Sequence, residues 1–341
     1  MKTAIVILNW NTKEFLKRFL PGLIDSIKGM DAEVIVADNA STDGSAELMK
    51  VQFPEVRTIV LDDNYGFTGG YNRAFQEIEA QYYVLMNSDI EVTQNWLDPL
   101  VRWMDTHPEC GACGPKLHSW YDRDCFEYAG AAGGMLDKWG YPFCRGRVLK
   151  KLEKDNGQYD SPADVFWITG ACLVTRSSLW KELGGLDSRF FAHMEEIDYC
   201  WRLQLKGHKV TVVPQSLVYH VGGGTLSNDS PFKLKLNYRN NLLMLQNNLA
   251  KTLVSDGESP SKALREASRR IFQRKCLDGC SAAVYLLTGK FKCFKSVIEA
   301  HKEAGLMSRC VTEDISVYKG ANICGRYDGS IIFASITGKK I

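Results

Sequence analysis

The 341-residue sequence predicts an α/β fold with a mainly parallel sheet, helices on both faces, and a helical C-terminal extension. Short apolar runs alternate with helix-like segments over residues 3–106, the order that gives parallel strands joined by crossover helices. Each apolar run also ends in polar residues. The carboxyl ends of parallel strands meet at one edge of a sheet, where open α/β folds bind ligands. Past about residue 236 the pattern is helical.

The first strand is predicted at residues 3–8, and it ends in Asn9, Trp10 and Asn11. A helix follows, because its apolar residues recur with a period near 3.6. Asn11 and Glu14 fit a capping arrangement at its start. Pro21 lies inside this pattern and is expected to kink or split the helix.

The second strand is predicted at 33–37 and ends in Asp38 and Asn39, with residues 41–45 opening a second helix. Asp38 can accept hydrogen bonds from a base or ribose, or can cap the turn at Ser41. The third strand is predicted at 57–61.

A glycine-rich segment at 64–72 follows the third strand and opens a helix that we expect to run through Ile78. Its three glycines would let backbone N–H groups approach a phosphate. The G-x-G-x-x-G spacing is absent, and an ordinary strand-to-helix turn is the alternative.

The fourth strand, at 82–86, ends in Asn87, Ser88 and Asp89. A buried carboxylate here needs a cation or hydrogen-bond donors. Oxygen ligands suit Mg²⁺ or Mn²⁺ held together with a substrate's phosphates. The alternative is a turn aspartate that caps a helix starting near Gln94.

Residues 107–165 are rich in Gly, Trp and Tyr, and we expect them to pass over the ligand edge. Within them, Cys110 and Cys113 have the spacing of a redox pair. The flanking prolines favour a short strand instead, since a redox pair of this kind begins a helix. Further strands are expected within 165–175 and at 210–213.

Glu195, Glu196 and Asp198 crowd the start of a predicted helix. The helix dipole stabilises carboxylates there, which is the structural explanation. Mutual repulsion would also raise a pKa toward useful basicity. His220 precedes three glycines, and it is either structural or a metal ligand on a flexible loop.

The overall composition excludes several classes of protein. The net charge of +2 gives no sign of a nucleic-acid partner, and 11 cysteines without a disulfide framework indicate a reducing, cytoplasmic setting. The apolar start is too short for a signal peptide, and no run approaches the ~18 apolar residues of a spanning helix. Residues 261–310 hold 11 Lys/Arg against 4 Asp/Glu, a local net of +7. That excess predicts either contact with a membrane surface or a solvated helical face.

Taken in order over residues 3–245, these motifs resemble the family 2 glycosyltransferases with the Rossmann-like GT-A fold, in particular the bacterial rhamnosyltransferase-like branch. The resemblance is carried by residues 6–11, 36–45, 64–72, 85–89, 169–171, 184–187, 190–202 and 220–223.

The resemblance implies that Asp38 binds the nucleotide base and that Asp89 is the last acid of a D-x-D-type metal motif, whose first acid is Asn87 here. His220 would complete the metal site. The family's Glu-Asp pair matches Glu195 and Glu196, with Glu196 as catalytic base. Contacts to the nucleotide sugar are expected from Asn9, Asn11, Asp38, Asn64, Gly69, Asn72, Asn87, Ser88, Asp89, Gly170 and Asp198.

A late Arg239-Asn240 element also resembles this branch, without a role that the sequence explains. The implied domains are a GT-A domain at 1–240, divided near residue 106 into nucleotide-binding and acceptor-side halves, and a basic helical extension at 241–341.

The predicted function is inverting transfer of a sugar from a nucleoside diphosphate sugar to a glycan or lipid-linked acceptor, using Mg²⁺ or Mn²⁺. The expected setting is cell-surface polysaccharide or glycolipid synthesis, in the cytoplasm or peripherally at the inner face of the membrane. A nucleotidyltransferase and a non-catalytic nucleotide-sugar-binding protein are the alternatives.

Overall fold

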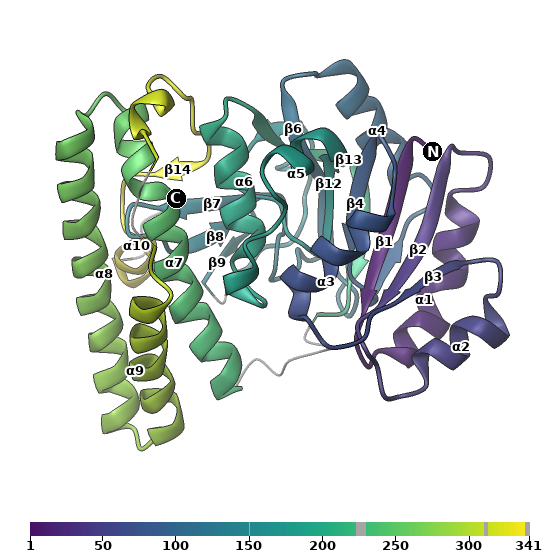
Figure 1. Cartoon of the computed structure of the whole chain (residues 1–341), viewed down its shortest axis with the longest axis horizontal. Helices are drawn as coiled ribbons and strands as arrows, with labels where there is room; N and C mark the ends of the chain where they lie inside the picture. Colours follow the sequence, from purple (N-terminus) through teal and green to yellow (C-terminus); the bar gives the residue numbers. More distant parts are fainter. Residues whose placement is uncertain (150, 223–229, 310–312, 338–341) are drawn as a thin grey trace.

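The computed structural model describes residues 1–149, 151–222, 230–309 and 313–337. Within them, a nine-stranded sheet forms the centre of the molecule, in the order β11-β13-β6-β12-β4-β1-β2-β3 with β5 paired to β13. Figure 1 shows this sheet with helices on both sides and the C-terminal helices beyond one edge. Its strands are β1 (Thr3–Asn9), β2 (Ala32–Asp38), β3 (Arg57–Val60), β4 (Tyr82–Met86), β5 (Ile90–Val92), β6 (Cys110–Ser119), β11 (Ala163–Asp164), β12 (Cys172–Arg176) and β13 (Lys209–His220).

The first four strands along the chain, β1 to β4, pair in parallel within this sheet, as predicted. Antiparallel pairing enters with β12, which lies between β4 and β6 and runs against both. Cys110 and Cys113 lie in strand β6, also as predicted, and both thiols are buried.

The helices cover both faces because alternate residues of each strand point to opposite sides. In β1, Ala4 and Val6 belong to one apolar core, whereas Ile5 and Ile7 belong to the other. The helices are α1 (Lys13–Ser26), α2 (Ser45–Gln52), α3 (Gly66–Ala74), α4 (Leu97–Thr106), α5 (Ser177–Glu182), α6 (Glu195–Leu205), α7 (Pro231–Ser255), α8 (Pro260–Leu287), α9 (Phe291–Leu306) and α10 (Ile331–Thr337), with short 3₁₀ turns η1 (Phe75–Glu77), η2 (Ser188–Phe190) and η3 (Ile315–Tyr318).

Several predicted helix boundaries are wrong. Helix α1 runs unbroken through Pro21, because its apolar face, including Leu16 and Leu20, is buried against the sheet. The predicted capping by Asn11 and Glu14 is not formed. Instead, the Lys13 N–H at the start of the helix donates to Asp43 Oδ2 (2.9 Å). Helix α4 begins at Leu97 rather than near Gln94.

The glycine-rich segment is itself helical, since α3 already begins at Gly66. The helix expected to reach Ile78 ends at Ala74 and continues only as the 3₁₀ turn η1.

A second, small sheet was not predicted. Within the described residues it has the order β10-β9-β8-β7-β14, formed by β7 (Gly134–Asp137), β8 (Pro142–Cys144), β9 (Arg147–Val148), β10 (Lys151–Leu152) and β14 (Arg326–Tyr327). Strand β14 comes from near the C-terminus and pairs in parallel with β7. Helix α7 also runs across the predicted domain boundary at residue 240. The division into two domains therefore stays a prediction.

Candidate active site

The carboxyl ends of β1 and β2 meet through a buried polar cluster. Asn9 donates from Nδ2 to Asp38 Oδ2 (2.8 Å) and to Ser41 Oγ (3.0 Å). The backbone N–H of Ser41 donates to Asp38 Oδ1 (2.8 Å). Both predicted roles of Asp38 therefore remain compatible with the geometry, since the carboxylate supports the turn at Ser41 and lies at the ligand edge. Asn11 lies beside this cluster with a positive φ of 54°, and its side chain accepts from Thr42 N (2.7 Å).

Asn39, which we did not predict as a site residue, organises the neighbouring loop. Its Nδ2 donates to Asn64 Oδ1 (2.9 Å) and to the Gly66 carbonyl (3.1 Å), and its Oδ1 accepts from Tyr65 N. The sequence could have indicated this residue, because Asn39 directly follows Asp38 at the end of a predicted strand. Asn39 thus fixes the start of α3 against the end of β2.

The glycines of α3 allow close packing. A Cβ on Gly66 would lie 2.5 Å from the Phe191 ring, and one on Gly70 would lie 2.7 Å from Leu8. A Cβ on Gly69 would lie 2.8 Å from the Cβ of Tyr65, the residue before the helix. These contacts explain the glycines without a ligand, and the predicted phosphate contact through Gly69 stays a prediction.

Asp89 is buried at the end of β4, next to His220 at the end of β13. The His220 Nε2 lies 3.1 Å from Asp89 Oδ1, and Gly222 N donates to Asp89 Oδ2 (3.1 Å). Burial opposes ionisation of Asp89, but the charge of His220 outweighs it and lowers the carboxyl pKa. The alternative in which Asp89 caps α4 is wrong, because its oxygens face β13 and α4 begins eight residues later.

A second carboxylate, from Glu127, lies on the other side of His220. Glu127 Oε1 is 3.4 Å from His220 Nδ1, and the glutamate is buried. Burial would lower the histidine pKa, yet the two carboxylates raise it to about 10. Glu127 was missed because it lies in an irregular segment with no motif.

The side chains around Asp89 offer few ligands to a divalent cation. Among the described residues, no three His, Cys, Asp or Glu side chains gather as a metal cluster. A divalent ion held mainly by phosphates needs only one or two protein carboxylates, with imidazole as an additional ligand that Mn²⁺ tolerates. Asp89 and His220 would fit that arrangement once a bound cation displaces the proton from the imidazole, because a histidine ligand must be neutral. Asn87 Nδ2 lies 3.5 Å from the same imidazole nitrogen.

The segment around Gly170 joins this cluster to the start of α6. Asn87 N donates to the Ala171 carbonyl (3.0 Å), and Ser88 Oγ lies 2.8 Å from Thr12 Oγ1. A Cβ on Gly170 would lie 2.9 Å from the Phe67 ring and 3.7 Å from Glu196 Cβ. The loop after β4 and Glu196 are therefore separated by one short glycine-containing turn.

Glu195 and Glu196 begin α6, as predicted, and each has a buried Oε2 atom without a hydrogen-bond partner. Burial, reinforced by Glu196 and then Asp198, raises the pKa of Glu195. Burial likewise raises the pKa of Glu196 to about 7. Backbone N–H groups of Glu196 and Ile197 donate to the Glu196 carboxylate, but its Oε2 atom has no partner. A carboxylate with a pKa near neutrality and one free oxygen is suited to accept a proton from a bound ligand.

Two predicted contact residues have their side-chain partners inside the protein. Asp198 is completely buried and accepts from Arg202 Nε (2.8 Å), Asn247 Nδ2 (2.9 Å) and Asn248 Nδ2 (2.8 Å). Asn72 pairs with the backbone of Leu186 through Nδ2 (2.7 Å) and Oδ1 (2.9 Å). The polar atoms of these two side chains are therefore already occupied by partners inside the protein and are not free to contact a nucleotide sugar.

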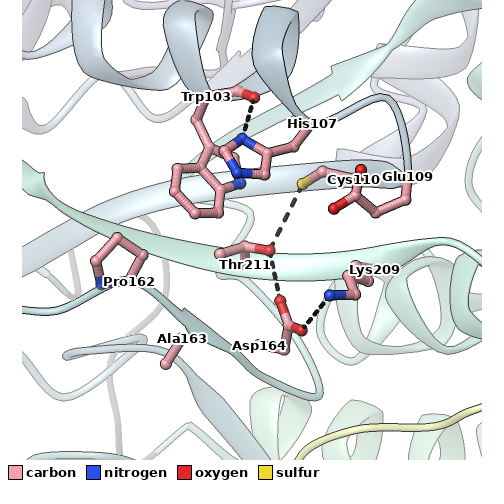
Figure 2. Close-up of a pocket in the computed structure, with 9 residues that line it drawn as sticks. All are labelled: Trp103, His107, Glu109, Cys110, Pro162, Ala163, Asp164, Lys209 and Thr211. Atoms are coloured by element: carbon pink, nitrogen blue, oxygen red, sulfur yellow. Dashed lines mark hydrogen bonds and ion pairs between the residues drawn. The ribbon is translucent and has the colours of Figure 1, made fainter.

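A cavity of about 250 Å³ lies elsewhere, at the amino ends of β6 and β13, and none of the predicted site residues lines it. Figure 2 shows its walls, in which Thr211 contacts Asp164 (2.9 Å) and Asp164 pairs with Lys209 (3.1 Å). These charges already have partners. The cavity is therefore distinct from the site at the carboxyl ends of the strands.

The strand order, with a carboxylate after β4 and a glutamate pair at the start of α6, agrees with the GT-A class of fold that the sequence predicts. Residues 4–180 match the family model described as Glycosyl transferase family 2, and the chain belongs to this family. This result confirms the predicted family and argues against the nucleotidyltransferase alternative.

Similar proteins agree with this assignment. The N-acetylglucosaminyl-diphospho-decaprenol L-rhamnosyltransferase of Mycobacterium tuberculosis is 26% identical over 259 residues, covering 71% of this chain and 83% of that protein. The low-salt glycan biosynthesis hexosyltransferase Agl10 of Haloferax volcanii is 23% identical, covering 58% of this chain and 60% of that protein. The protein is thus a rhamnosyltransferase-like member of the family, and one of these relatives is named for glycan biosynthesis.

Solved structures confirm the GT-A fold. Mannosyltransferase PcManGT from Pyrobaculum calidifontis, in complex with GDP-Man and Mn²⁺, has a TM-score of 0.52 at 13% identity, covering 92% of this chain and 88% of that one. Residues 1–349 of S. aureus TarS, in complex with UDP-GlcNAc, also give a TM-score of 0.52, at 14% identity, covering 90% of this chain and 93% of that one.

Proposed function

We propose that this glycosyltransferase moves a hexosyl or rhamnosyl group from a nucleoside diphosphate sugar to a hydroxyl of a glycan or lipid-linked acceptor, with inversion at the anomeric carbon. The observation that carries the proposal is the pair of buried, partnerless carboxylate oxygens on Glu195 and Glu196, beside the loop that follows β4. The named activity of the mycobacterial relative supports the transferred sugar and the acceptor class. The GDP-Man and UDP-GlcNAc bound in the two solved structures support the donor class.

In this proposal Glu196 removes the proton from the acceptor hydroxyl. The acceptor oxygen then attacks the anomeric carbon as the bond to the diphosphate breaks, so one displacement inverts the configuration. No covalent sugar–enzyme intermediate is needed. The raised pKa of Glu196, about 7, matches the requirement that a general base titrate near the working pH.

Asp38, with Asn9 and Asn39 around it, supplies the nucleotide end of the site. Asp89 and His220 would hold a divalent cation beside the donor's diphosphate. Such a cation, when bound, neutralises negative charge that develops on the leaving group. The Mn²⁺ in the mannosyltransferase neighbour supports this use of the site.

We also propose that the C-terminal helices bind an anionic membrane surface. No helix in the described part of the chain is long and apolar enough to cross a bilayer. The turn between α8 and α9 exposes apolar side chains, with Leu287 87% and Phe291 65% exposed. Exposed Lys290 and Lys292 flank them. Each lysine near anionic lipid contributes ~1 kcal/mol, and apolar side chains can enter the headgroup region.

The placement of this turn suits a lipid-linked acceptor. In Figure 1 the turn between α8 and α9 lies at the lower end of the molecule, the end toward which β1 runs from the N-terminus. Asn9 ends β1 on that side. A membrane at this end would therefore face the ligand edge of the sheet.

The function is tested by incubating the protein with a panel of nucleotide sugars and measuring thermal stability and released nucleoside diphosphate. A true donor at ~100 times its dissociation constant should add ~2.7 kcal/mol of stability. Transfer to a polyprenyl-diphosphate sugar would identify the acceptor class. Stabilisation by a donor without any released diphosphate, across a range of acceptors, would instead support the non-catalytic alternative.

A further inference from the structure

The turn that leads into α6 has a conformation that its sequence does not favour. Phe191 has φ 63° and ψ −61°, and Ala192 N donates to the Phe190 carbonyl across it (2.7 Å), which makes a γ-turn of the rare, strained kind. His193 and Met194 follow, each with φ 72°. None of these residues is glycine, so this backbone persists only if its surroundings hold it.

Asn240 of α7 makes the contacts that hold this turn. Its Nδ2 lies 2.8 Å from each of three carbonyl oxygens, those of Phe190, Ala192 and His193. The side chain is completely buried. Three carbonyls from four successive residues can converge on one amide only when the backbone curls back on itself. The strained turn and the position of Asn240 therefore depend on each other.

Arg239 fixes Asn240 and adds to the same contacts. Its Nε donates to Asn240 Oδ1 (2.9 Å), and its Nη2 donates to the Phe190 carbonyl (2.9 Å). On its other side, Nη1 donates to Glu303 Oε2 of α9 (3.1 Å). The guanidinium is buried and spans the space between the helical extension and the turn.

The glutamates follow this turn directly, because α6 begins at Glu195. The buried Oε2 atoms of Glu195 and Glu196 have no partner, so no hydrogen bond at these atoms helps to set where the carboxylates lie. The hydrogen bonds that the two carboxylates do accept come from backbone N–H groups at the start of α6, so their position depends on the backbone that carries them. We propose that Arg239 and Asn240 are positioning residues, which hold the 190–194 turn so that the candidate base faces the acceptor.

This inference rests on the proposed role of Glu196, and the experiment separates the two. Transfer is measured for wild type, Glu196→Gln, Asn240→Ala and Arg239→Lys. The lysine variant keeps the charge facing Glu303 but loses the planar fork of donors. The matched control is Asn241→Ala, because Asn241 is a buried neighbour on α7 that donates to the Gly140 carbonyl (2.6 Å) of a different loop.

We expect kcat to fall about 10²-fold in Asn240→Ala and less in Arg239→Lys. A small displacement of a reacting group lowers the rate by about that factor. The KM for the donor and the thermal shift with donor should stay near wild type. The acidic limb of the pH–rate profile should move to lower pH, because a loosened turn hydrates Glu196. Asn241→Ala should lower the melting temperature while kcat and the pH profile stay near wild type.

A second test relieves the backbone strain of the 190–194 turn in a double variant. It measures recovery of kcat, so it remains informative if Asn240→Ala is unstable. Glycine adopts positive φ at little cost, so Met194→Gly added to Asn240→Ala should recover part of the lost kcat. Unchanged kcat and pH profile in Asn240→Ala, with Glu196→Gln inactive, would overturn the positioning role alone. An active Glu196→Gln would overturn the proposed base instead. Equal losses of kcat in Asn240→Ala and Asn241→Ala would show that Asn240 only supports the fold, and would contradict its positioning role.

Discussion

Asp89 and His220 form a buried ion pair, with Nε2 3.1 Å from Oδ1, although 131 residues separate them in the sequence. Strand pairing brings them together, because β5 follows Asp89 directly and Ile90 is the register partner of His220. The end of β13 is thereby held against the loop that follows β4. This pairing places an imidazole beside the aspartate that we predict to end a D-x-D-type motif.

Asp89→Asn should lower donor affinity and transfer rate together, because the lost ligand would contact both the ground state and the transition state. A charge-stabilising metal is worth several kcal/mol, so we expect a loss of at least about 10² in rate. Donor binding measured by calorimetry with and without Mn²⁺ should differ in wild type and coincide in the variant. Full activity after exhaustive chelation would contradict the metal site.

Glu196→Gln should reduce transfer by about 10²–10⁴, because glutamine keeps the size of the side chain but cannot accept the proton. Its thermal stabilisation by donor should remain. Glu196→Asp restores the usual family residue and should keep more activity than the glutamine variant. Glu195→Gln is the matched neighbour, and its effect should appear mainly in acceptor affinity. An inactive Glu195→Gln beside an active Glu196→Gln would move the base by one residue.

Activity and stability should respond to pH in opposite directions. The pKa of Glu196 is raised to about 7, so transfer should fall as pH drops below that value and protonates the base. A carboxyl group with a raised folded-state pKa binds its proton more tightly in the native state. Its contribution to stability is therefore complete below the unfolded-state pKa and is lost as pH rises through the folded-state value.

The stability part is measured with Glu195→Gln, which replaces a buried carboxyl group whose pKa is also raised. The variant should be more stable than wild type at pH 8, because the buried carboxyl group resists losing its proton in the folded state. The difference should shrink toward pH 4. A constant difference between the two proteins across this range would show that Glu195 does not titrate with folding.

Asp198→Ala should destabilise the protein by about 3–5 kcal/mol, because it removes the carboxylate that pairs with Arg202 and takes the acceptor from the buried Asn248 amide. Chemical denaturation measures this loss. Asp256→Ala is the control, since its pair with Arg326 is 37% exposed on each side and should be worth less than about 1 kcal/mol. Similar losses in both variants would contradict a special role for the buried acceptor.

Replacing Leu287 and Phe291 with glutamate should abolish flotation with anionic liposomes and leave transfer to a water-soluble acceptor intact. The exposed apolar side chains lose their affinity for the headgroup region, and the new charges repel anionic lipid. Val317→Glu is the control, because Val317 is 72% exposed but lies outside the α8–α9 turn. Equal flotation of wild type with neutral and anionic vesicles, or none with either, would count against the membrane surface.

The sequence by itself determined the first half of the sheet and the residues at its ligand edge. Alternation of apolar and polar residues marks strands, and a strand's end is a local event, so Asp38, Asn87 and Asp89 could be placed at that edge in advance. The clustering of Glu195 and Glu196 at a helix start is local too. The ordered motifs then identified the family, which the match over residues 4–180 confirms.

The tertiary structure alone decided which polar groups have partners. Asp198 and Asn72 are satisfied inside the protein, whereas the Oε2 atoms of Glu195 and Glu196 are not. Glu127 reaches His220 from an irregular segment. Asn240 reaches back 50 residues to the Phe190 carbonyl. Hydrogen-bond partners across such separations depend on how helices and loops pack, and neither composition nor periodicity encodes that packing.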